Sequence, residues 1–402
     1  PEGKVAVAVS GGADSMCLLA LTAASFDVTA ITVDHALRDG SAAEADWVAR
    51  YCAANNIPHV TLTWEGDKPT ANIQAGARDA RYSLMMNWCR EKHVQYIATA
   101  HHQDDQAETV LLRLARGSGV YGLAGMAPTR DLGDGIILVR PLLDVPKKDL
   151  LDTLGDIGQD WLEDPSNQSE AYDRVRIRNF LKAPPVEGLS AKRIAATAAR
   201  MRRSRDALEY YEGQWLKTAV TVHDEAYIFL KPSLLSSEPE EVVLRGLASI
   251  CRHVSGEGYV PRMEKLLRLR NALGAENFLG HTLYGVKFSP YENGTVMGTR
   301  ELAAAQAPCA LKHKQIWDKR FAIETKGDIS GLTLTTLGVR GWAGLKKQMT
   351  SFNKIGVPRL AGIALPAVYK GEELCAVPHL GYDTLTTIEI SVSPTSGCLT
   401  QK

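Results

Sequence analysis

The stretch Val5-Ala-Val-Ala-Val-Ser-Gly-Gly-Ala-Asp-Ser15 decides the fold of the first part of this chain. The run from Val5 to Val9 is apolar and rich in valine, as expected for a short buried strand. Two glycines and two serines follow it, and a helical pattern begins at Met16. A strand that leads through a turn of small residues into a helix is the opening unit of a parallel α/β sheet.

The turn from Ser10 to Ser15 has the composition of a phosphate-binding loop. Glycines let backbone N–H groups approach an anion, serine hydroxyls can donate to it, and a helix N-terminus favours its negative charge. The alternative is an ordinary tight turn in which Asp14 or Ser15 caps the helix. We predict phosphate binding, because five specified positions occur between a strand and a helix.

Two other nucleotide motifs are excluded. The Walker A pattern is absent from the sequence. A G-x-G-x-x-G pattern occurs at Gly117 to Gly122, but it follows a helical pattern rather than a strand, which is the wrong context for a dinucleotide-binding turn.

Strand and helix patterns alternate through the first 150 residues. The expected strands are Val5–Val9, Val28–Val33, Val60–Trp64, Tyr96–Ala100 and Ile136–Leu142. The expected helices are Met16–Ala24, Ala42–Asn55, Ala75–Lys92 and Asp105–Leu114. Repeated βα units predict a doubly wound parallel sheet covered on both faces, with ligands at the carboxyl ends of its strands.

Two breaks in the pattern predict three domains. Lys182-Ala-Pro-Pro-Val-Glu-Gly-Leu189 disrupts helix and strand patterns alike, and Glu301-Leu-Ala-Ala-Ala-Gln-Ala-Pro308 has the composition of a linker. We expect an α/β domain at 1–185, a mostly helical domain at 190–300 and a small α+β domain at 305–402. The middle domain opens with a long helix from about Ser190 to Ala219 and continues as a mixed segment.

Charge is balanced overall and uneven along the chain. The 46 basic and 46 acidic residues give no net charge, yet residues 1–150 contain 14 Lys and Arg against 18 Asp and Glu. The segment from Arg174 to Arg205 contains ten basic residues and a single acidic one, Glu187. A solvated helix face accounts for such a segment, but dense Lys and Arg more often bind a polyanion such as RNA.

Cysteine usage and hydropathy exclude several classes of protein. The seven cysteines form no C-x-x-C pair, which argues against a disulfide scaffold, a zinc ribbon and a cysteine-bound cluster. No stretch approaches the ~18 uncharged apolar residues that a membrane span requires. We expect a cytoplasmic protein with no membrane partner.

A second chemical motif, Ala100-His-His-Gln-Asp-Asp-Gln-Ala-Glu-Thr109, follows the fourth strand. It places Asp105 and Glu108 one turn apart on one helix face, where two carboxylates can hold a cationic substrate or a metal ion. Compensation of the helix dipole is the alternative interpretation. His101 and His102 are either ligands or ordinary hydrogen-bonding residues.

The loop S-G-G-x-D-S resembles that of the PP-loop ATP pyrophosphatase superfamily, and roughly residues 3 to 205 resemble the tRNA(Ile)-lysidine synthase family. The second resemblance rests on several motifs taken together. They are Val33-Asp-His-Ala-Leu-Arg38, Ser41-Ala-Ala-Glu-Ala45, Ala77-Arg78, Arg81-Tyr82, His101 to Gly119, Glu163-Asp-Pro-Ser-Asn167 and Arg174-Val-Arg-Ile-Arg178.

The resemblance implies a reaction and its participants. ATP and Mg²⁺ are the implied cofactors, and tRNA(Ile) with a CAU anticodon and free L-lysine are the implied partners. The C2 oxygen of the wobble cytidine attacks the α-phosphate of ATP, and the lysine amine then displaces AMP to give lysidine. The sequence leaves a homodimer open.

The resemblance also implies roles for individual residues. The catalytic set is Asp14, Asp105, Glu108 and Arg178, of which Asp105 and Glu108 bind lysine and Asp14 helps to hold Mg²⁺. The ATP-binding set is Ser10, Gly11, Gly12, Ala13, Asp14, Ser15, Asp34, Arg78 and Gly117. The tRNA-binding set is Arg174, Arg176, Arg193, Arg200, Arg202, Arg203 and Arg205. In the last domain, Arg340, Trp342, Lys346 and Lys347 either contact tRNA or form a solvated surface.

Two rival functions remain. A PP-loop tRNA 2-thiolation enzyme would share the loop and the RNA substrate, but it would need catalytic or cluster-binding cysteines. Cys17, Cys52 and Cys89 fall within helical patterns, where a small core residue is expected. A non-catalytic nucleotide-binding or RNA-binding module is the other rival.

Overall fold

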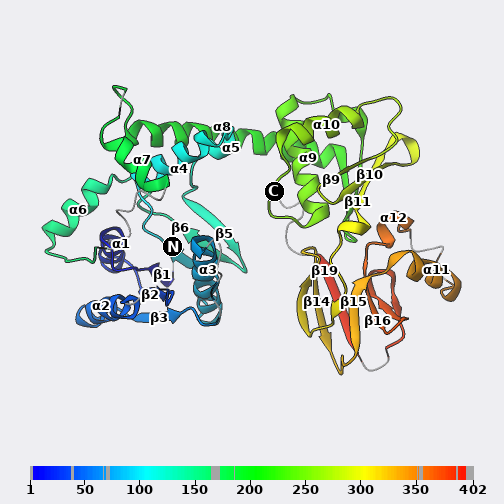
Figure 1. Cartoon of the computed structure of the whole chain (residues 1–402), viewed down its shortest axis with the longest axis horizontal. Helices are drawn as coiled ribbons and strands as arrows, with labels where there is room; N and C mark the ends of the chain where they lie inside the picture. Colours follow the sequence, from blue (N-terminus) through cyan, green and yellow to red (C-terminus); the bar gives the residue numbers. More distant parts are fainter. Residues whose placement is uncertain are drawn as a thin grey trace. The chain divides into compact units, whose positions relative to one another are not determined.

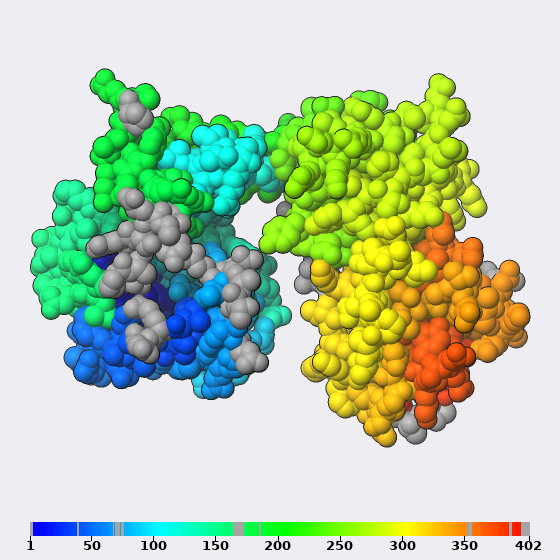
Figure 2. Space-filling model, in the orientation of Figure 1, coloured from blue at the N-terminus to red at the C-terminus, as the bar shows by residue number. Residues whose placement is uncertain are grey.

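A computed structural model describes residues 3–37, 40–66, 68, 73–163, 173–184, 186–350, 352, 356–385 and 388–394. Arg38 and residues 164–167, which belong to the motifs quoted above, lie outside these ranges. The chain divides into two compact units, Pro1–Asp206 and Ala207–Lys402, whose elements are labelled in Figure 1 and whose surfaces are drawn in Figure 2. Within the described ranges, every helix is too short or too polar to cross a membrane.

The first unit contains the expected parallel sheet. Its strand order is β3-β2-β1-β4-β6-β5. The strands are β1 (Val5–Ala8), β2 (Val28–Asp34), β3 (His59–Thr63), β4 (Tyr96–Ala98), β5 (Thr129–Gly133) and β6 (Ile136–Val139). All neighbours pair in parallel except the edge strand β5, which pairs antiparallel with β6. The five expected strands are confirmed, and β5 was missed because its sequence, Thr-Arg-Asp-Leu-Gly, is polar and mostly exposed.

Helices cover both faces of this sheet. They are α1 (Ala13–Ala23), α2 (Ser41–Ala54), α3 (Ile73–Glu91), α4 (Gln103–Ala115), α5 (Val120–Leu123), α6 (Lys147–Asp156) and α7 (Asp173–Lys182). Val5 and Val7 of β1 belong to a core cluster with α1, α2 and α6. Ala6, which points to the opposite face, belongs to a second cluster with α3. The sheet is therefore buried on both sides, as its uninterrupted apolar strands indicate.

The break between the units lies inside α8 (Ala191–Ala219), not at the expected linker at 182–189. Ile194 and Ala198, in the first turns of α8, pack against Ala107 and Val110 of α4. This apolar contact holds the start of the long helix in the first unit. The Pro-Pro segment is therefore a loop within that unit rather than its end.

The first part of the second unit combines the expected helices with a sheet. Besides the end of α8 it contains α9 (Glu240–Ser255) and α10 (Met263–Leu273). Five antiparallel strands lie in the order β7-β8-β11-β10-β9. They are β7 (Val220–His223), β8 (Tyr227–Leu230), β9 (His281–Leu283), β10 (Val286–Pro290) and β11 (Val296–Arg300). Residues 207–300 therefore contain more strand than "mostly helical" implies. The sequence did not reveal these strands because each is only three to five residues long.

The last part of the second unit is α+β, as expected. Two antiparallel sheets have the orders β12-β15-β16-β17-β18 and β13-β14-β19. The strands are β12 (Cys309–Ala310), β13 (Lys314–Trp317), β14 (Phe321–Lys326), β15 (Leu332–Thr336), β16 (Pro366–Lys370), β17 (Glu373–Val377), β18 (Tyr382–Asp383) and β19 (Glu389–Pro394). The helices are α11 (Gly338–Gln348) and α12 (Arg359–Gly362), and the 3₁₀ turns of the unit are η2 (Pro232–Leu234), η3 (Glu292–Gly294), η4 (Leu302–Ala304) and η6 (Pro378–Leu380).

Trp342 is a core residue and not a surface residue of α11. It is 8% exposed, and its ring lies 4.9 Å from that of Phe352. A Cβ at Gly362 would lie 1.8 Å from the indole ring, so the glycine makes room for it. The expectation that Trp342 could contact tRNA was wrong, whereas Arg340, Lys346 and Lys347 are exposed.

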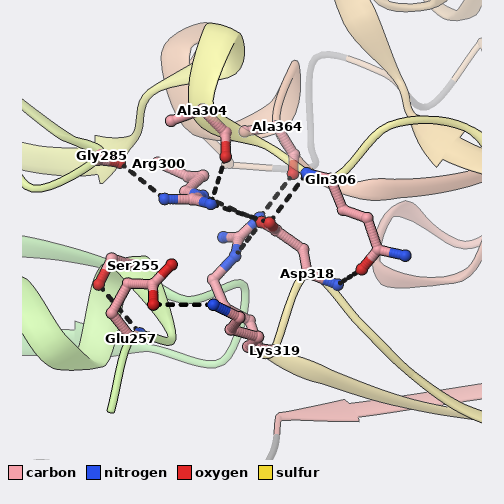
Figure 3. Close-up of polar contacts among 10 residues, drawn as sticks. Ser255, Glu257, Gly285, Arg300, Ala304, Gln306, Asp318, Lys319 and Ala364 are labelled. Atoms are coloured by element: carbon pink, nitrogen blue, oxygen red, sulfur yellow. Dashed lines mark hydrogen bonds and ion pairs between the residues drawn. The ribbon is translucent and has the colours of Figure 1, made fainter. Parts of the chain in front are cut away.

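A buried charge cluster joins the two parts of the second unit (Figure 3). Arg300, at the end of β11, donates two hydrogen bonds to Asp318, at 3.0 Å and 2.9 Å. Arg320 donates to the same carboxylate at 2.8 Å, and all three side chains are no more than 6% exposed. The backbone of Gln306 donates to Asp318 as well, at 3.0 Å. The Ala-rich segment 301–308 is therefore anchored rather than free.

We expect Asp318→Asn to destabilise the second unit by about 3 kcal/mol, because two buried guanidinium groups lose their counter-charge. Asparagine retains tolerance for the left-handed backbone at this position, where φ is +49°. The measurement is urea unfolding followed by tryptophan fluorescence. The neighbouring Lys319→Ala is the control: Lys319 is 64% exposed and pairs with Glu257, so its loss should cost about 1 kcal/mol or less. Equal effects of the two variants would contradict this account of the cluster.

Candidate active site

The loop between β1 and α1 is shaped by glycine. Gly11 has φ +85°, and a Cβ there would lie 2.8 Å from Cδ1 of Leu162. The backbone N–H of Leu162 donates to the Gly11 carbonyl at 2.9 Å, so this segment holds the turn from outside. Gly12 occupies the N-cap position of α1, where the described residues supply no capping side chain. The first backbone N–H groups of α1 are thus left for an anion.

The serines of the loop fix its internal geometry. Ser15 Oγ accepts a hydrogen bond from the Ser10 backbone N–H at 3.1 Å and donates to the Gly12 carbonyl at 2.8 Å. The hydroxyl of Ser10 lies 3.3 Å from that of Ser15. The two side chains therefore hold the turn in the open shape that a phosphate requires.

A cavity of ≈ 370 Å³ lies at the carboxyl ends of β1, β2 and β4. Its apolar walls include Ile31, Val33 and Met85. Its polar lining consists of Ser10, Gly12, Asp14, Ser15, Arg78, Arg81, Tyr82, Thr99, His101, Asp105, Arg174 and Arg178. An apolar wall beside phosphate-binding groups suits a nucleotide, whose base is flat and largely apolar on its faces.

Asp14 stands at the centre of an ionic network. Its Oδ2 lies 3.4 Å from Nε2 of His102 and 3.2 Å from Nζ of Lys147. Burial acts to raise the pKa of Asp14, yet His102 and Lys147 hold that pKa below its ordinary value. The other oxygen, Oδ1, is buried and has no hydrogen-bond partner among the described residues. Asp14 is therefore an ionised carboxylate with one oxygen available.

His102 is enclosed by carboxylates. Its side chain is 3% exposed, and its ring also lies 3.7 Å from Asp104 and 3.5 Å from Asp105. Burial acts to lower the pKa of His102, but the hydrogen bond to Asp14 and the charges of Asp105 and Asp14 raise it. His101, by contrast, bonds Thr99 at 3.1 Å, and burial lowers its pKa to about 4. The two adjacent histidines thus have opposite electrostatic roles.

Asp105 and Glu108 lie one turn apart at the start of α4, as expected. Glu108 is 2% exposed, and its Oε1 accepts a hydrogen bond from Nε of Arg178 at 2.8 Å. Its Oε2 is buried without a partner in the described parts of the chain. Burial raises the pKa of Glu108, since Arg178 is 37% exposed and offsets only part of the desolvation. A cationic group would complete this site.

The cavity does not collect every residue of the expected ATP-binding set. Asp34 ends β2, and its Oδ1 accepts from the backbone N–H of Ala36 at 2.8 Å, so it shapes a turn. Gly117 lies beyond α4 with φ +72° and is not among the lining residues. This position agrees with the sequence, in which the G-x-G-x-x-G pattern follows a helix rather than a strand.

Two residues that line the cavity, Arg81 and Tyr82, and a third that contacts Asp14, Lys147, were given no role by sequence reasoning. Arg81 lies 3.2 Å from His35 Nε2, and burial lowers the pKa of that guanidinium. Tyr82 lies under Arg78, whose guanidinium carbon is 5.3 Å from the ring centre. Lys147 contacts Asp14 across 133 positions of sequence. The quoted Arg-Tyr pair was a signal for the first two, and the only signal for Lys147 was its place after the last parallel strand.

The arginines of the tRNA-binding set differ in exposure and in partners. Arg174 and Arg178 line the cavity, and Arg176 pairs with Asp173. Arg202 donates to the Met126 carbonyl at 2.9 Å, and Arg205 pairs with Asp206 at 2.7 Å. Arg193, Arg200 and Arg203 are exposed on α8. The exposed members are the stronger candidates for contacts with a polyanion.

The cysteines of the first unit do not supply a nucleophile. Cys17, Cys52 and Cys89 are fully buried. Burial raises the pKa of Cys52 to about 11 and that of Cys89 to about 12, so both remain thiols. No group of three metal-binding side chains occurs in the part of the chain that the structure describes. The thiolation chemistry considered above therefore has no support at this site.

Fold and loop together define the first unit as an ATP-binding PP-loop domain, and the PP-loop domain family matches residues 1–184. The tRNA(Ile)-lysidine synthase of Ruegeria pomeroyi is 36% identical over 395 residues, covering 97% of this chain and 92% of its own length. That of Wolbachia pipientis wMel is 34% identical over 398 residues, covering 96% and 91%. That of a Methylobacterium species is 42% identical over 276 residues, covering 67% and 79%. The chain belongs to the tRNA(Ile)-lysidine synthase family.

The raised pKa of Glu108 predicts a pH-dependent effect of Glu108→Gln on stability. Because the pKa is above 4.5 in the folded state, protonation favours folding, and this contribution is lost as the pH rises through the folded-state pKa. Glutamine does not ionise, so the variant has no such loss. We therefore expect the unfolding free energy of the variant, relative to that of the parent, to increase as the pH rises above about 4.5. Urea unfolding at several pH values measures this, with the exposed Glu91→Gln as control. A difference that is independent of pH would contradict the assignment.

Proposed function

We propose that this protein ligates free L-lysine to C2 of the wobble cytidine of tRNA(Ile) with a CAU anticodon. The reaction consumes ATP and releases AMP and pyrophosphate through an adenylated cytidine. The observation that carries this proposal is one cavity lined by the phosphate loop, Asp105 and Arg178, and Arg178 in turn binds Glu108, one turn from Asp105. Membership of the tRNA(Ile)-lysidine synthase family supports the same reaction.

ATP binds with its phosphates at the start of α1. Backbone N–H groups of the first turn donate to the phosphates, Ser10 and Ser15 hold the loop in shape, and the apolar wall of Ile31 and Val33 receives the base. The C2 oxygen of cytidine forms a bond to the α-phosphorus while the bond to the β-phosphate oxygen breaks. Donors fixed before the reaction stabilise the charge that develops on these oxygens.

Asp14 is the residue that fits Mg²⁺. It is ionised, and its Oδ1 is buried without a hydrogen-bond partner in the described structure. Mg²⁺ typically takes one or two carboxylate ligands and completes its shell with water and substrate phosphates, so a full protein cage is not required. When bound, the ion would neutralise negative charge on the leaving pyrophosphate.

Asp105 and Glu108 bind the lysine substrate. Two carboxylates one turn apart favour a cationic side chain or ammonium group over a neutral amino acid. Glu108 also accepts a hydrogen bond from Arg178, and Arg178 lines the same cavity as the phosphate loop. The lysine amine then attacks C2, and AMP leaves with the C2 oxygen.

The proposed reaction also bears on the RNA contacts, the cellular compartment and the oligomeric state. Arg193, Arg200 and Arg203 contact the phosphate backbone of tRNA, together with Arg174 and Arg176 near the cavity. The reaction takes place in the cytoplasm, where tRNA and free lysine occur together. It does not require a homodimer, because the groups assigned to ATP and lysine lie in one chain.

We expect the protein to form AMP and pyrophosphate from Mg-ATP and tRNA(Ile), and to transfer labelled lysine to the RNA. Asp14→Ala should lower AMP formation by about 100-fold or more while leaving tRNA affinity largely intact. Asp105→Asn and Glu108→Gln should raise the KM for lysine by roughly 10- to 100-fold, as expected for lost charged hydrogen bonds. ATP cleavage without lysine transfer would indicate another nucleophile, and no cleavage would favour a binding module.

We expect tRNA affinity to fall steeply with salt, because binding of phosphates releases counterions. Replacing Arg200 and Arg203 by alanine should weaken binding and reduce the slope of log K against log salt by about one unit per lost contact. Filter binding at several salt concentrations provides the measurement. Arg50→Ala, on the exposed surface of α2, should leave the slope unchanged. The RNA interface would be misplaced if Arg50→Ala had the same effect as the double variant.

A further inference from the structure

Lys147 is the first residue of α6, and its amine lies 3.2 Å from Oδ2 of Asp14. Its side chain is 41% exposed and that of Asp14 is 29% exposed. An ion pair with this much solvent contact contributes little to stability. The contact therefore calls for an explanation other than folding.

Backbone contacts carry Lys147 to this position without help from its amine. The backbone N–H of Lys147 donates to Oδ2 of Asp104 at 2.9 Å. Gln103, at the start of α4, donates from its backbone to the Val145 carbonyl at 3.0 Å and from its side chain to the Asp144 carbonyl at 3.2 Å. The loop before α6 is thus joined to the first turn of α4.

Apolar packing aims the side chain of Lys147 at α1. Leu150 and Leu154 of α6 are 1% and 0% exposed and share a core cluster with residues of α1. Positions 147, 150 and 154 follow the spacing of one helix face, so Lys147 extends the face that packs on α1. Lys148 lies on a different face, where it pairs with Asp152 and is 81% exposed.

His102 and Lys147 contact the same oxygen of Asp14. His102 approaches Oδ2 from the start of α4 and Lys147 approaches it from the start of α6, while Oδ1 has no partner among the described residues. Rotation of the carboxylate would break both contacts. The contacts of His102 and Lys147 therefore fix one oxygen and leave the other for a ligand.

We propose that Lys147 is a positioning residue, which holds Asp14 by Oδ2 so that Oδ1 is presented to the Mg²⁺ ion that accompanies ATP. The proposal rests on the function proposed above and assigns to that function a residue on α6. His102 is the buried partner in the same task, and Lys147 is the one that can be replaced without leaving an unpaired group in the core.

The test compares Lys147→Met, Lys147→Arg and the adjacent Lys148→Met. Methionine keeps the length of the side chain and removes the charge, and all backbone contacts of α6 remain. The first readout is equilibrium binding of α,β-methylene-ATP, which cannot be cleaved between the α- and β-phosphates, at increasing Mg²⁺ concentration. The second is kcat and KM for ATP and for lysine, and the third is the melting temperature.

We expect Lys147→Met to raise the Mg²⁺ concentration for half-maximal binding of the analogue by about tenfold, and to lower kcat by roughly 10- to 100-fold. The KM for lysine and the melting temperature should stay near the parent values. Lys147→Arg should keep the Mg²⁺ requirement and kcat close to the parent values, because the guanidinium can also hold Oδ2. Lys148→Met should match the parent.

Two results would overturn the proposal. An unchanged Mg²⁺ requirement in Lys147→Met would show that Asp14 needs no second anchor. A lower Mg²⁺ requirement would show that Lys147 acts only as a repelling charge. Failure of the proposed function gives a different pattern, since the parent itself would then transfer no lysine to tRNA while the analogue-binding measurements remained informative.

Discussion

The active site depends on the meeting of three helix N-termini around one buried imidazole. Asp14 comes from the first turn of α1, Asp104 and Asp105 from the first turn of α4, and Lys147 begins α6. Each helix end carries partial positive charge, which three carboxylates help to balance. His102, with its raised pKa, binds these carboxylates together. The phosphate loop, Asp14 and the carboxylates at the start of α4 are therefore parts of one electrostatic assembly.

This assembly also explains why Glu108 is tolerated in the core. A fully buried carboxylate with one unpaired oxygen weakens the free protein, and Arg178 compensates only in part. In the function proposed above, a lysine ammonium group would supply the missing counter-charge, so that substrate binding would also remove this cost. A buried polar group with incomplete hydrogen bonds is typical of a binding site. A group that only stabilised the fold would have all its hydrogen-bond partners within the protein.

The sequence predicts local features of the site well and its long-range contacts poorly. The β1–α1 turn and the Asp105–Glu108 spacing depend on residues within one turn of each other, so their patterns suffice. The contact between Lys147 and Asp14 depends on how α6 packs on α1, which the spacing of Leu150 and Leu154 indicates only after the sheet order is known. The helix α8 was predicted with nearly its observed bounds, but the edge strand β5 and the unit to which the first turns of α8 belong were not, since tertiary contacts decide both.

In the second unit, composition predicts a linker where buried charged residues in fact hold two parts of the chain together. Residues 301–308 are rich in alanine and read as a linker, yet Arg300, Gln306 and Arg320 all bind the single carboxylate of Asp318. Separating the two parts that flank this segment would leave the buried guanidinium of Arg300 without its counter-charge, which is far more costly than losing an exposed pair. Residues 207–300 and 309–394 are thus joined through Asp318 into one body. If Arg340, Lys346 and Lys347 contact tRNA, they do so as part of that body rather than as a tethered module.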